Sequence, residues 1–419
     1  MQSSINNYFL SLKKFIIKNE LKLIYFFLAL AVFNNLSHFI RKNLLGDRVD
    51  FWDFHVYWCS ANKFLNGMNP YGGETIKDCL SQFNFDLYFS YPPIVLKLLA
   101  FLGYLELNTA KIIWIAIVGI SFFLIIYFLK KTYQIPRIIF FSFLIIFTGG
   151  GLVWGALLAG NISIILYAIL SIGICYLIKK KKDIYYLSVF FISLVKFPFL
   201  IFLLMPTFLY GYKELKRSFF YLFLTLFIYY LQFYFDKELF MSFLNSTKTY
   251  RDEGFLLIHG TGIGIHGMID LYQNILYEKT NVKFFNPSGS ITFFIHFFIS
   301  GTLFVSSYFL FQRKYYTFQN KIIDVKQEKL LISFFIAIFL CCFPRISSYD
   351  FFLLVSSFFY IVRNSRIKLL GDNWNFIVCL LTISVLAIYD SKYPAFVISF
   401  FLFLCFYLQI KNKDPFYLK

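Results

Sequence analysis

Two carboxylates three residues apart, Asp50 and Asp53, stand among aromatic residues shortly after the first long apolar segment. A carboxylate that is kept beside apolar rings at a membrane surface usually serves chemistry or transport, because its desolvation costs free energy. A partly desolvated carboxylate can also take a proton from a hydroxyl nucleophile, so each acid is a candidate general base. The alternative is a solvated loop with surface acids, and it suits Asp50 better than Asp53.

Two cations, Lys196 and Arg345, lie within two residues of prolines in apolar runs, in LVKFPF and FPRISSYD respectively. Ammonium and guanidinium groups bind phosphate strongly where water is scarce, so these residues are candidates for a phosphate clamp. The alternative is a structural ion pair, for example between Arg345 and Asp350.

A glycine-rich stretch, LLIHGTGIGIHG, carries His259 and His266. It lacks the strand–turn–helix context of a nucleotide-binding loop, and a zinc site would need a third ligand. We expect a flexible loop over a cavity, in which either histidine hydrogen-bonds a phosphate or a sugar. Asp-x-x-Asp likewise offers few ligands, so we predict no metal site.

The elements that position these residues are apolar. The 419-residue chain is 59% hydrophobic and 15% charged, whereas about a quarter of the residues in soluble proteins are charged. Apolar runs of about twenty residues recur, which predicts an all-α polytopic membrane protein, one domain over residues 1–419, with about 12 transmembrane helices. No cleavable signal pattern precedes the first span, Leu23–Ile40, so we expect this span to be retained.

Basic residues gather in seven clusters that hold 25 Lys and Arg, and with the seven acids in or near these clusters their balance is +18, which equals the net charge of the chain. The positive-inside rule places these clusters in the cytoplasm together with both termini, so nucleic acid is not needed as a partner. The outer side then holds a first loop, residues 41–110, and a second loop, residues 236–290. The clusters are Lys13–Lys22, Lys130–Arg137, Lys179–Lys182, Lys213–Arg217, Arg313–Lys329, Arg363–Lys368 and Lys411–Lys419.

Two segments do not fit a simple span. Val95–Leu105 is apolar but too short to cross, which predicts a helix at the membrane interface. The interval between Lys182 and Lys213 is too long for one transmembrane helix, and it is short for two full-length ones. Two short helices meeting at a tip near Lys196 on the outer side would explain it, and a single kinked helix is the alternative. The other expected spans are 112–129, 138–152, 162–178, 219–235, 291–311, 376–389 and 396–408.

Two of the seven cysteines, Cys59 and Cys79, share the first outer loop. A disulfide between them is one possibility, although an odd total argues against complete pairing.

Three motifs in the first outer loop form a series: Asp53 with Val56 and Tyr57, then Asn69-Pro70-Tyr71, then Tyr91-Pro92-Pro93. This series resembles family 87 of the glycosyltransferases, polytopic enzymes of the GT-C class that use polyprenyl-phosphate sugars, typically mannose. Further similarities are Trp114 at the head of the second span, GALLAGN ending at Asn161, LVKFPF, and FPRISSYDFFLL. Many members have His where this chain has Asp350.

The resemblance implies a hexosyltransferase of the cell envelope, in a bacterial inner membrane, without a cofactor. Asp53 would be the catalytic base, with Asp50 in reserve, and an acceptor glycolipid or glycan would supply the hydroxyl. The donor phosphate would be held by Lys196, Arg345, His259 or His266. Asp350 would contact substrate, and Tyr57, Tyr71 and Tyr91 would stack on sugars or seat the loop in the interface.

Two other functions remain open at this point. A transporter or flippase for lipid-linked saccharides would share the broken helices, but it would not need one indispensable acid, and no inverted repeat is evident. An O-antigen ligase or polymerase usually carries a large late outer loop with Arg and His, whereas residues 236–290 contain only Arg251 as an arginine.

Overall fold

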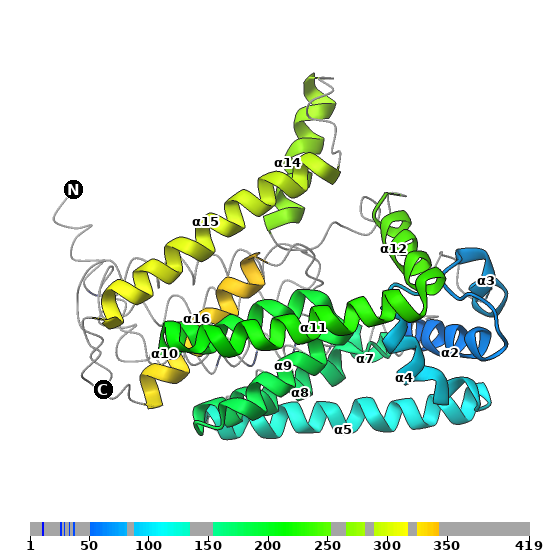
Figure 1. Cartoon of the computed structure of the whole chain (residues 1–419), viewed down its shortest axis with the longest axis horizontal. Coiled ribbons are helices and arrows are strands. Elements are labelled where there is room, and N and C mark those ends of the chain that lie inside the picture. The colour runs from blue at the N-terminus through cyan, green and yellow to red at the C-terminus, as the bar shows by residue number, and fades with distance from the viewer. Residues whose placement is uncertain are drawn as a thin grey trace.

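The computed structural model describes residues 51–81, 88–134, 154–252, 265–280, 289–316 and 325–342, and the single positions Ser11, Phe26, Ala29, Phe33 and Ser37. These ranges fold into helices and contain no β-strand, so the all-α prediction is confirmed for them (Figure 1). The expected spans 138–152, 376–389 and 396–408 lie outside the described residues, as does the first span apart from single positions.

Within the described ranges, two helices are long and apolar enough to cross a membrane. One is α5, Leu107–Tyr133, and the other is the short η4, Tyr212–Glu214, continued by α11, Leu215–Phe235. Both match predicted spans, and both leave most of their apolar surface exposed, with Phe123 and Phe223 among the outward-facing rings. A helix at the core of a soluble protein would bury these rings, so the exposed surface fits contact with lipid.

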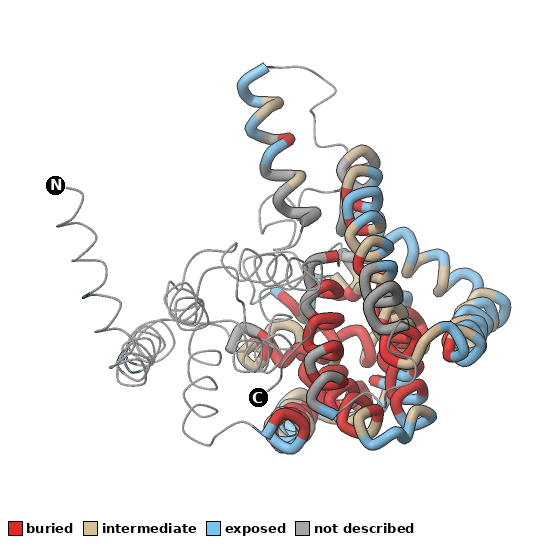
Figure 2. The backbone as a smooth tube through the Cα atoms, turned by 90° about the vertical axis from the view of Figure 1, so that its left-hand side faces the viewer, coloured by how far each residue is buried: buried red, intermediate tan, exposed pale blue. Residues whose placement is uncertain are grey.

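The buried core lies in one helical body. Short α7, Trp154–Ala159, leads into α8, Ser163–Ile178, which packs between α5 and α9, Lys182–Val195. Trp114 of α5 donates a hydrogen bond from Nε1 to the Gly160 carbonyl just before α8, at 2.7 Å. Because α5 packs along α8 from this shared end, the two helices run in the same direction. Buried residues gather in this body and are sparse on the outlying helices (Figure 2).

The interval around Lys196 is a hairpin. After α9, Lys196 is extended, and the chain returns through the 3-10 helix η3, Phe197–Leu204, and α10, Met205–Tyr210. The Tyr185 hydroxyl near the start of α9 donates to the Phe202 carbonyl in η3, and Lys182 pairs with Glu214 at 2.7 Å. The version with two short helices is therefore correct, and Lys196 lies at its tip. Pro198 explains the break, because its ring cannot continue the helix.

The helical body has two unlike ends. One end exposes Lys179, Lys181, Lys213 and Lys216 around the α8–α9 turn and η4. The other end holds the tip of the hairpin and the break before α8. The length of α8 separates them, since its 16 residues correspond to about 24 Å.

The predicted first outer loop is built at the end opposite the lysines, from α2, Trp52–Leu65, the short α3 and η2, Gly73–Leu80, and α4, Pro93–Gly103. As predicted for the region after Tyr91, α4 is helical and too short to cross. From the predicted second outer loop, α12, Lys237–Asp252, contacts the first: Asn69 donates to the Ser242 hydroxyl at 2.8 Å. The two expected outer loops therefore meet at one end of the molecule.

The remaining described helices are α14, Ile265–Thr280, α15, Gly289–Tyr316, and α16, Val325–Cys342. Helix α16 joins the end with the exposed lysines, where the buried Glu328 carboxylate accepts hydrogen bonds from Lys180 at 2.8 Å and from the Tyr210 hydroxyl. This contact anchors α16 to the α8–α9 turn and to α10.

Candidate functional site

Helix α2 presents Asp53 in its first turn, and the start of α2 is docked on the break between α7 and α8. The Phe51 N–H donates to the Leu158 carbonyl at 2.6 Å. Gly160 has φ +65°, and a Cβ there would lie 2.7 Å from the Phe51 ring. A glycine is therefore required at this position, both for its left-handed backbone and for the close approach of α2.

Asn161, the residue after this glycine, binds Asp53 directly. Its side-chain Nδ2 donates to Asp53 Oδ2 at 2.6 Å, while its Oδ1 accepts from the Ser163 N–H at 2.8 Å. The second bond is a turn of the kind that asparagine side chains commonly make with backbone two residues ahead. It fixes the amide so that the donor end faces the carboxylate.

Lys196 reaches the same place from the tip of the hairpin. Its Nζ donates to the Ser163 hydroxyl at 2.6 Å, and its charge acts on the Asp53 carboxylate. Asp53 and Lys196 were predicted as site residues from separate motifs, and the fold brings them together at the start of α8. Their positions in the sequence did not predict this proximity.

The electrostatic setting makes Asp53 a stronger base than an ordinary aspartate. Burial raises the pKa of Asp53 from 3.8 to about 6, and the Asn161 hydrogen bond and the Lys196 charge offset part of that rise. The residue keeps part of its surface exposed while its carboxylate is enclosed. The N-termini of α2 and α8 also favour a negative charge here. A carboxylate with such a pKa is mostly ionised at neutral pH and suited to accept a proton.

Three tyrosines form the wall next to this group. The Tyr57 hydroxyl, one turn after Asp53, accepts the Ile162 N–H at 3.3 Å and shares a hydrogen bond with the Tyr91 hydroxyl at 3.1 Å. The Tyr71 hydroxyl donates to the Tyr91 carbonyl at 2.8 Å. The rings of Tyr57 and Tyr71 are buried, whereas Tyr91 is partly exposed. Of the three, Tyr91 is therefore the one that can touch a substrate without rearrangement, and the other two pack the loop.

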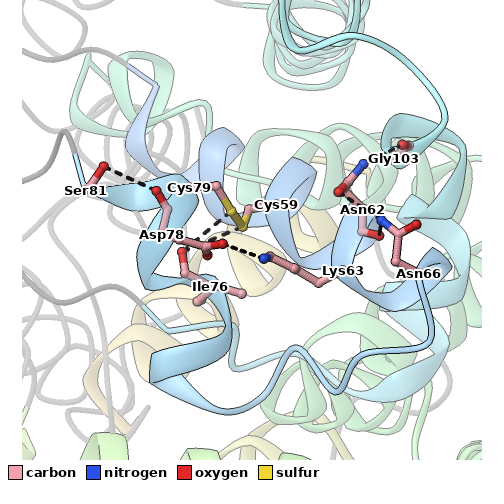
Figure 3. Close-up of a disulfide and its surroundings, with 9 residues drawn as sticks. All are labelled: Cys59, Asn62, Lys63, Asn66, Ile76, Asp78, Cys79, Ser81 and Gly103. Atoms are coloured by element: carbon pink, nitrogen blue, oxygen red, sulfur yellow. Dashed lines mark hydrogen bonds and ion pairs between the residues drawn. A yellow bond between two sulfur atoms is a disulfide. The ribbon is translucent and has the colours of Figure 1, made fainter.

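A disulfide and an ion pair link α2 to the segment that follows it. Cys59 forms a disulfide with Cys79, and Lys63 pairs with Asp78 at 2.6 Å (Figure 3). Both links join α2 to the α3–η2 segment, so the helix that carries Asp53 is held by this segment as well as by its contacts near α8. The pairing of Cys59 with Cys79, which the sequence left open, is thus present in the structure.

Several predicted site residues are not placed. Asp50, His259, Arg345 and Asp350 lie outside the described residues, and only the backbone of His266, in α14, is described. Sequence reasoning did not assign a role to Asn161 or Ser163. The available signal was a polar residue right after a helix-breaking glycine at the start of an apolar helix, and it did not reveal the contact with Asp53.

The chemistry that these groups can perform is proton abstraction next to a bound anion. Asp53 can accept a proton, and Lys196 can hold a negatively charged group close to it. Within the described ranges, no three His, Cys, Asp or Glu side chains are grouped so as to hold a metal ion. No protein-family model matches this chain, and no curated protein or solved structure matches it either.

Proposed function

We propose that the protein is an integral membrane glycosyltransferase that transfers a sugar from a polyprenyl-phosphate donor to an acceptor hydroxyl. The observation that carries this proposal is the enclosed Asp53 carboxylate, bound by Asn161, with the Lys196 ammonium beside it at the end of an apolar helical body. A base and a phosphate-binding cation at one place are what this reaction requires. The resemblance of the first-loop motifs to glycosyltransferase family 87 supports the same choice.

In the proposed reaction, Asp53 takes the proton of the acceptor hydroxyl while the hydroxyl oxygen forms a bond to the anomeric carbon. The bond between that carbon and the phosphate oxygen breaks, and the electron pair leaves with polyprenyl phosphate. Attack opposite the leaving group inverts the anomeric centre. Lys196 stabilises the charge that develops on the phosphate, which is an electrostatic contribution of the type that often dominates catalysis.

The proposal places this site on the outer face of a cell membrane, in a GT-C-like fold with about 12 spans and both termini in the cytoplasm. Two observations support the orientation. The exposed lysines around the α8–α9 turn and η4 lie at the opposite end of the body from Asp53. The Cys59–Cys79 disulfide lies at the same end as Asp53, and disulfides persist in oxidising compartments outside the cytoplasm.

The donor and acceptor are proposed by class. Mannose is the sugar typical of the family that the motifs resemble, and a glycolipid or glycan would provide the hydroxyl. Arg345, His259 and His266 remain proposed phosphate ligands, Asp50 remains a reserve base, and Asp350 a proposed substrate contact.

The test is sugar transfer from synthetic polyprenyl-phosphate mannose by the purified protein in lipid nanodiscs. We expect transfer by the wild type and a loss of about 10²–10⁴-fold in Asp53→Asn, which is the usual contribution of a general base. Asp78→Asn is the matched control, because Asp78 is an exposed acid of the same loop, paired with Lys63, and it should retain transfer. Full transfer by Asp53→Asn would remove Asp53 as the base, and lipid movement across vesicles without transfer would favour a transporter.

A further inference from the structure

The segment Asn161–Ser163 touches both halves of the candidate site. Asn161 binds Asp53 on one side, and Ser163 binds Lys196 on the other, through hydrogen bonds that are each 2.6 Å long. The Ser163 N–H joins the two by donating to Asn161 Oδ1. A continuous hydrogen-bonded path therefore connects the carboxylate to the ammonium through Asn161, just before α8, and Ser163, its first residue.

We infer that Asn161 is a positioning residue for the general base, and that Ser163 extends the same positioning to Lys196. This inference rests on the proposed function for its role in the reaction, while the contacts themselves do not depend on it. Asn161 holds Oδ2 of Asp53, and no described residue hydrogen-bonds to the other carboxylate oxygen, Oδ1. Oδ1 is then the oxygen that takes the acceptor proton.

The direction of the Asn161 amide is essential to this role. An asparagine presents a donor at Nδ2 and an acceptor at Oδ1, and only the donor end attracts a carboxylate. The Ser163 N–H occupies Oδ1, so a flipped amide would lose this bond and would place Oδ1 against the carboxylate. The backbone of Ser163 thus determines which end of Asn161 faces Asp53.

The support beneath the segment is rigid. The Gly160 carbonyl accepts from Trp114, and the Ile162 N–H donates to the Tyr57 hydroxyl, so the residues on both sides of Asn161 are bonded to neighbouring helices. The distance between base and cation is therefore set by the fold. Such preorganisation is what an active site needs, because small misplacements of reacting groups cost large factors in rate.

Asn161→Asp tests the positioning role with little change of shape. Two carboxylates would then face each other across the short contact, and they would share one proton with a strongly raised apparent pKa. The described groups that act on Asp53 are Asn161, Lys196 and Tyr57, and the last two are unchanged in this variant. The acidic limb of the pH profile for kcat/KM should therefore move to higher pH by about one unit or more. Asn66→Asp, an exposed asparagine of the same loop, is the matched control and should not move it.

A kinetic comparison separates positioning from folding. Asn161→Ala should lower kcat about 10–100-fold with little change in KM for polyprenyl-phosphate mannose, because the donor is held by Lys196 and not by Asn161. Ser163→Ala should raise that KM, and Ser163→Thr, which keeps the hydroxyl, should restore it. An unchanged pH profile in Asn161→Asp, while Asp53→Asn is inactive, would overturn the inference and leave the proposed function standing.

A measurement without catalysis decides the matter if the wild type transfers no mannose. In detergent, the melting temperature of Asn161→Asp should fall more steeply between pH 5 and pH 8 than that of the wild type, because the shared proton is lost in that interval. The double variant with Asp53→Asn should abolish the difference. Identical pH dependence in wild type and Asn161→Asp would show that residues 53 and 161 are not coupled and would overturn the inference.

Discussion

At the scale of single residues, Asp53 is held between opposing effects. Burial disfavours its charge, whereas an amide donor, a nearby ammonium and two helix N-termini favour it. The outcome is a pKa of about 6, raised but still below neutral. A carboxylate that is both ionised and basic near pH 7 is useful for proton transfer, and it is a burden for stability.

That burden gives a pH-dependent prediction for Asp53→Asn. Because the folded-state pKa of about 6 exceeds the ordinary value of 3.8, the stabilisation from the protonated form is complete below about pH 4 and is lost as pH rises through 6. The neutral asparagine avoids this loss. The melting temperature of Asp53→Asn in detergent should match that of the wild type near pH 4 and exceed it at pH 8. The corresponding gain in free energy of unfolding at pH 8 is at most about 3 kcal/mol.

The matched control is Asp78→Asn. Lys63 lowers the pKa of Asp78 through a hydrogen bond, so Asp78 has no penalty for the variant to remove. Its melting temperature should not rise at pH 8. A melting temperature of Asp53→Asn at or below the wild-type value at pH 8 would contradict the burial of this carboxylate.

At the scale of elements, the site depends on how closely α2 approaches the break before α8. Gly160→Ala places a Cβ 2.7 Å from the Phe51 ring on a backbone with φ +65°. We expect a loss of about 1–3 kcal/mol in stability, because alanine is strained in this conformation and the ring must move. Transfer should also fall, since Asn161 follows directly and would shift away from Asp53. Thermal melting and transfer rate measure the two effects.

Gly119→Ala is the control for that substitution. Gly119 lies within α5, where an added Cβ would meet nothing within 4 Å. Alanine favours the helix more than glycine does, so this variant should be neutral or slightly more stable. Equal behaviour of the two variants would mean that Gly160 does not control the approach of α2.

The sequence could predict most elements and few of their contacts. The length of the apolar runs was sufficient to predict α5 and α11. Lys196 and Pro198 within one apolar run were sufficient to predict the hairpin. The contact between Asp53 and Asn161 joins residues that are 108 positions apart. Periodicity and composition are local signals, so they carry no information on which helix end meets which loop. The same reason explains why Asp53 and Lys196 were separate candidates before the fold joined them.

At the scale of the whole molecule, charge and chemistry are separated along one axis. The α8–α9 turn and η4 carry exposed lysines, while the opposite end carries Asp53, the disulfide and the contact between Asn69, in the loop after α2, and helix α12. Helix α11 spans the same axis, from Glu214 near the lysines to Asp236, which pairs with Lys97 of α4. A membrane that surrounds the apolar belt would thus have the candidate site on one face and the basic cluster on the other.

This axis predicts which residues a membrane-impermeant thiol reagent reaches. In a variant with the five cysteines other than Cys59 and Cys79 replaced by serine, Met68→Cys lies at the site end and Lys181→Cys at the basic end, both at exposed positions. Maleimide coupled to polyethylene glycol should label Met68→Cys in intact spheroplasts and Lys181→Cys only after permeabilisation, since lysine-rich ends remain in the cytoplasm. Early labelling of Lys181→Cys would reverse the orientation, and it would place the disulfide in a reducing compartment where it would not persist.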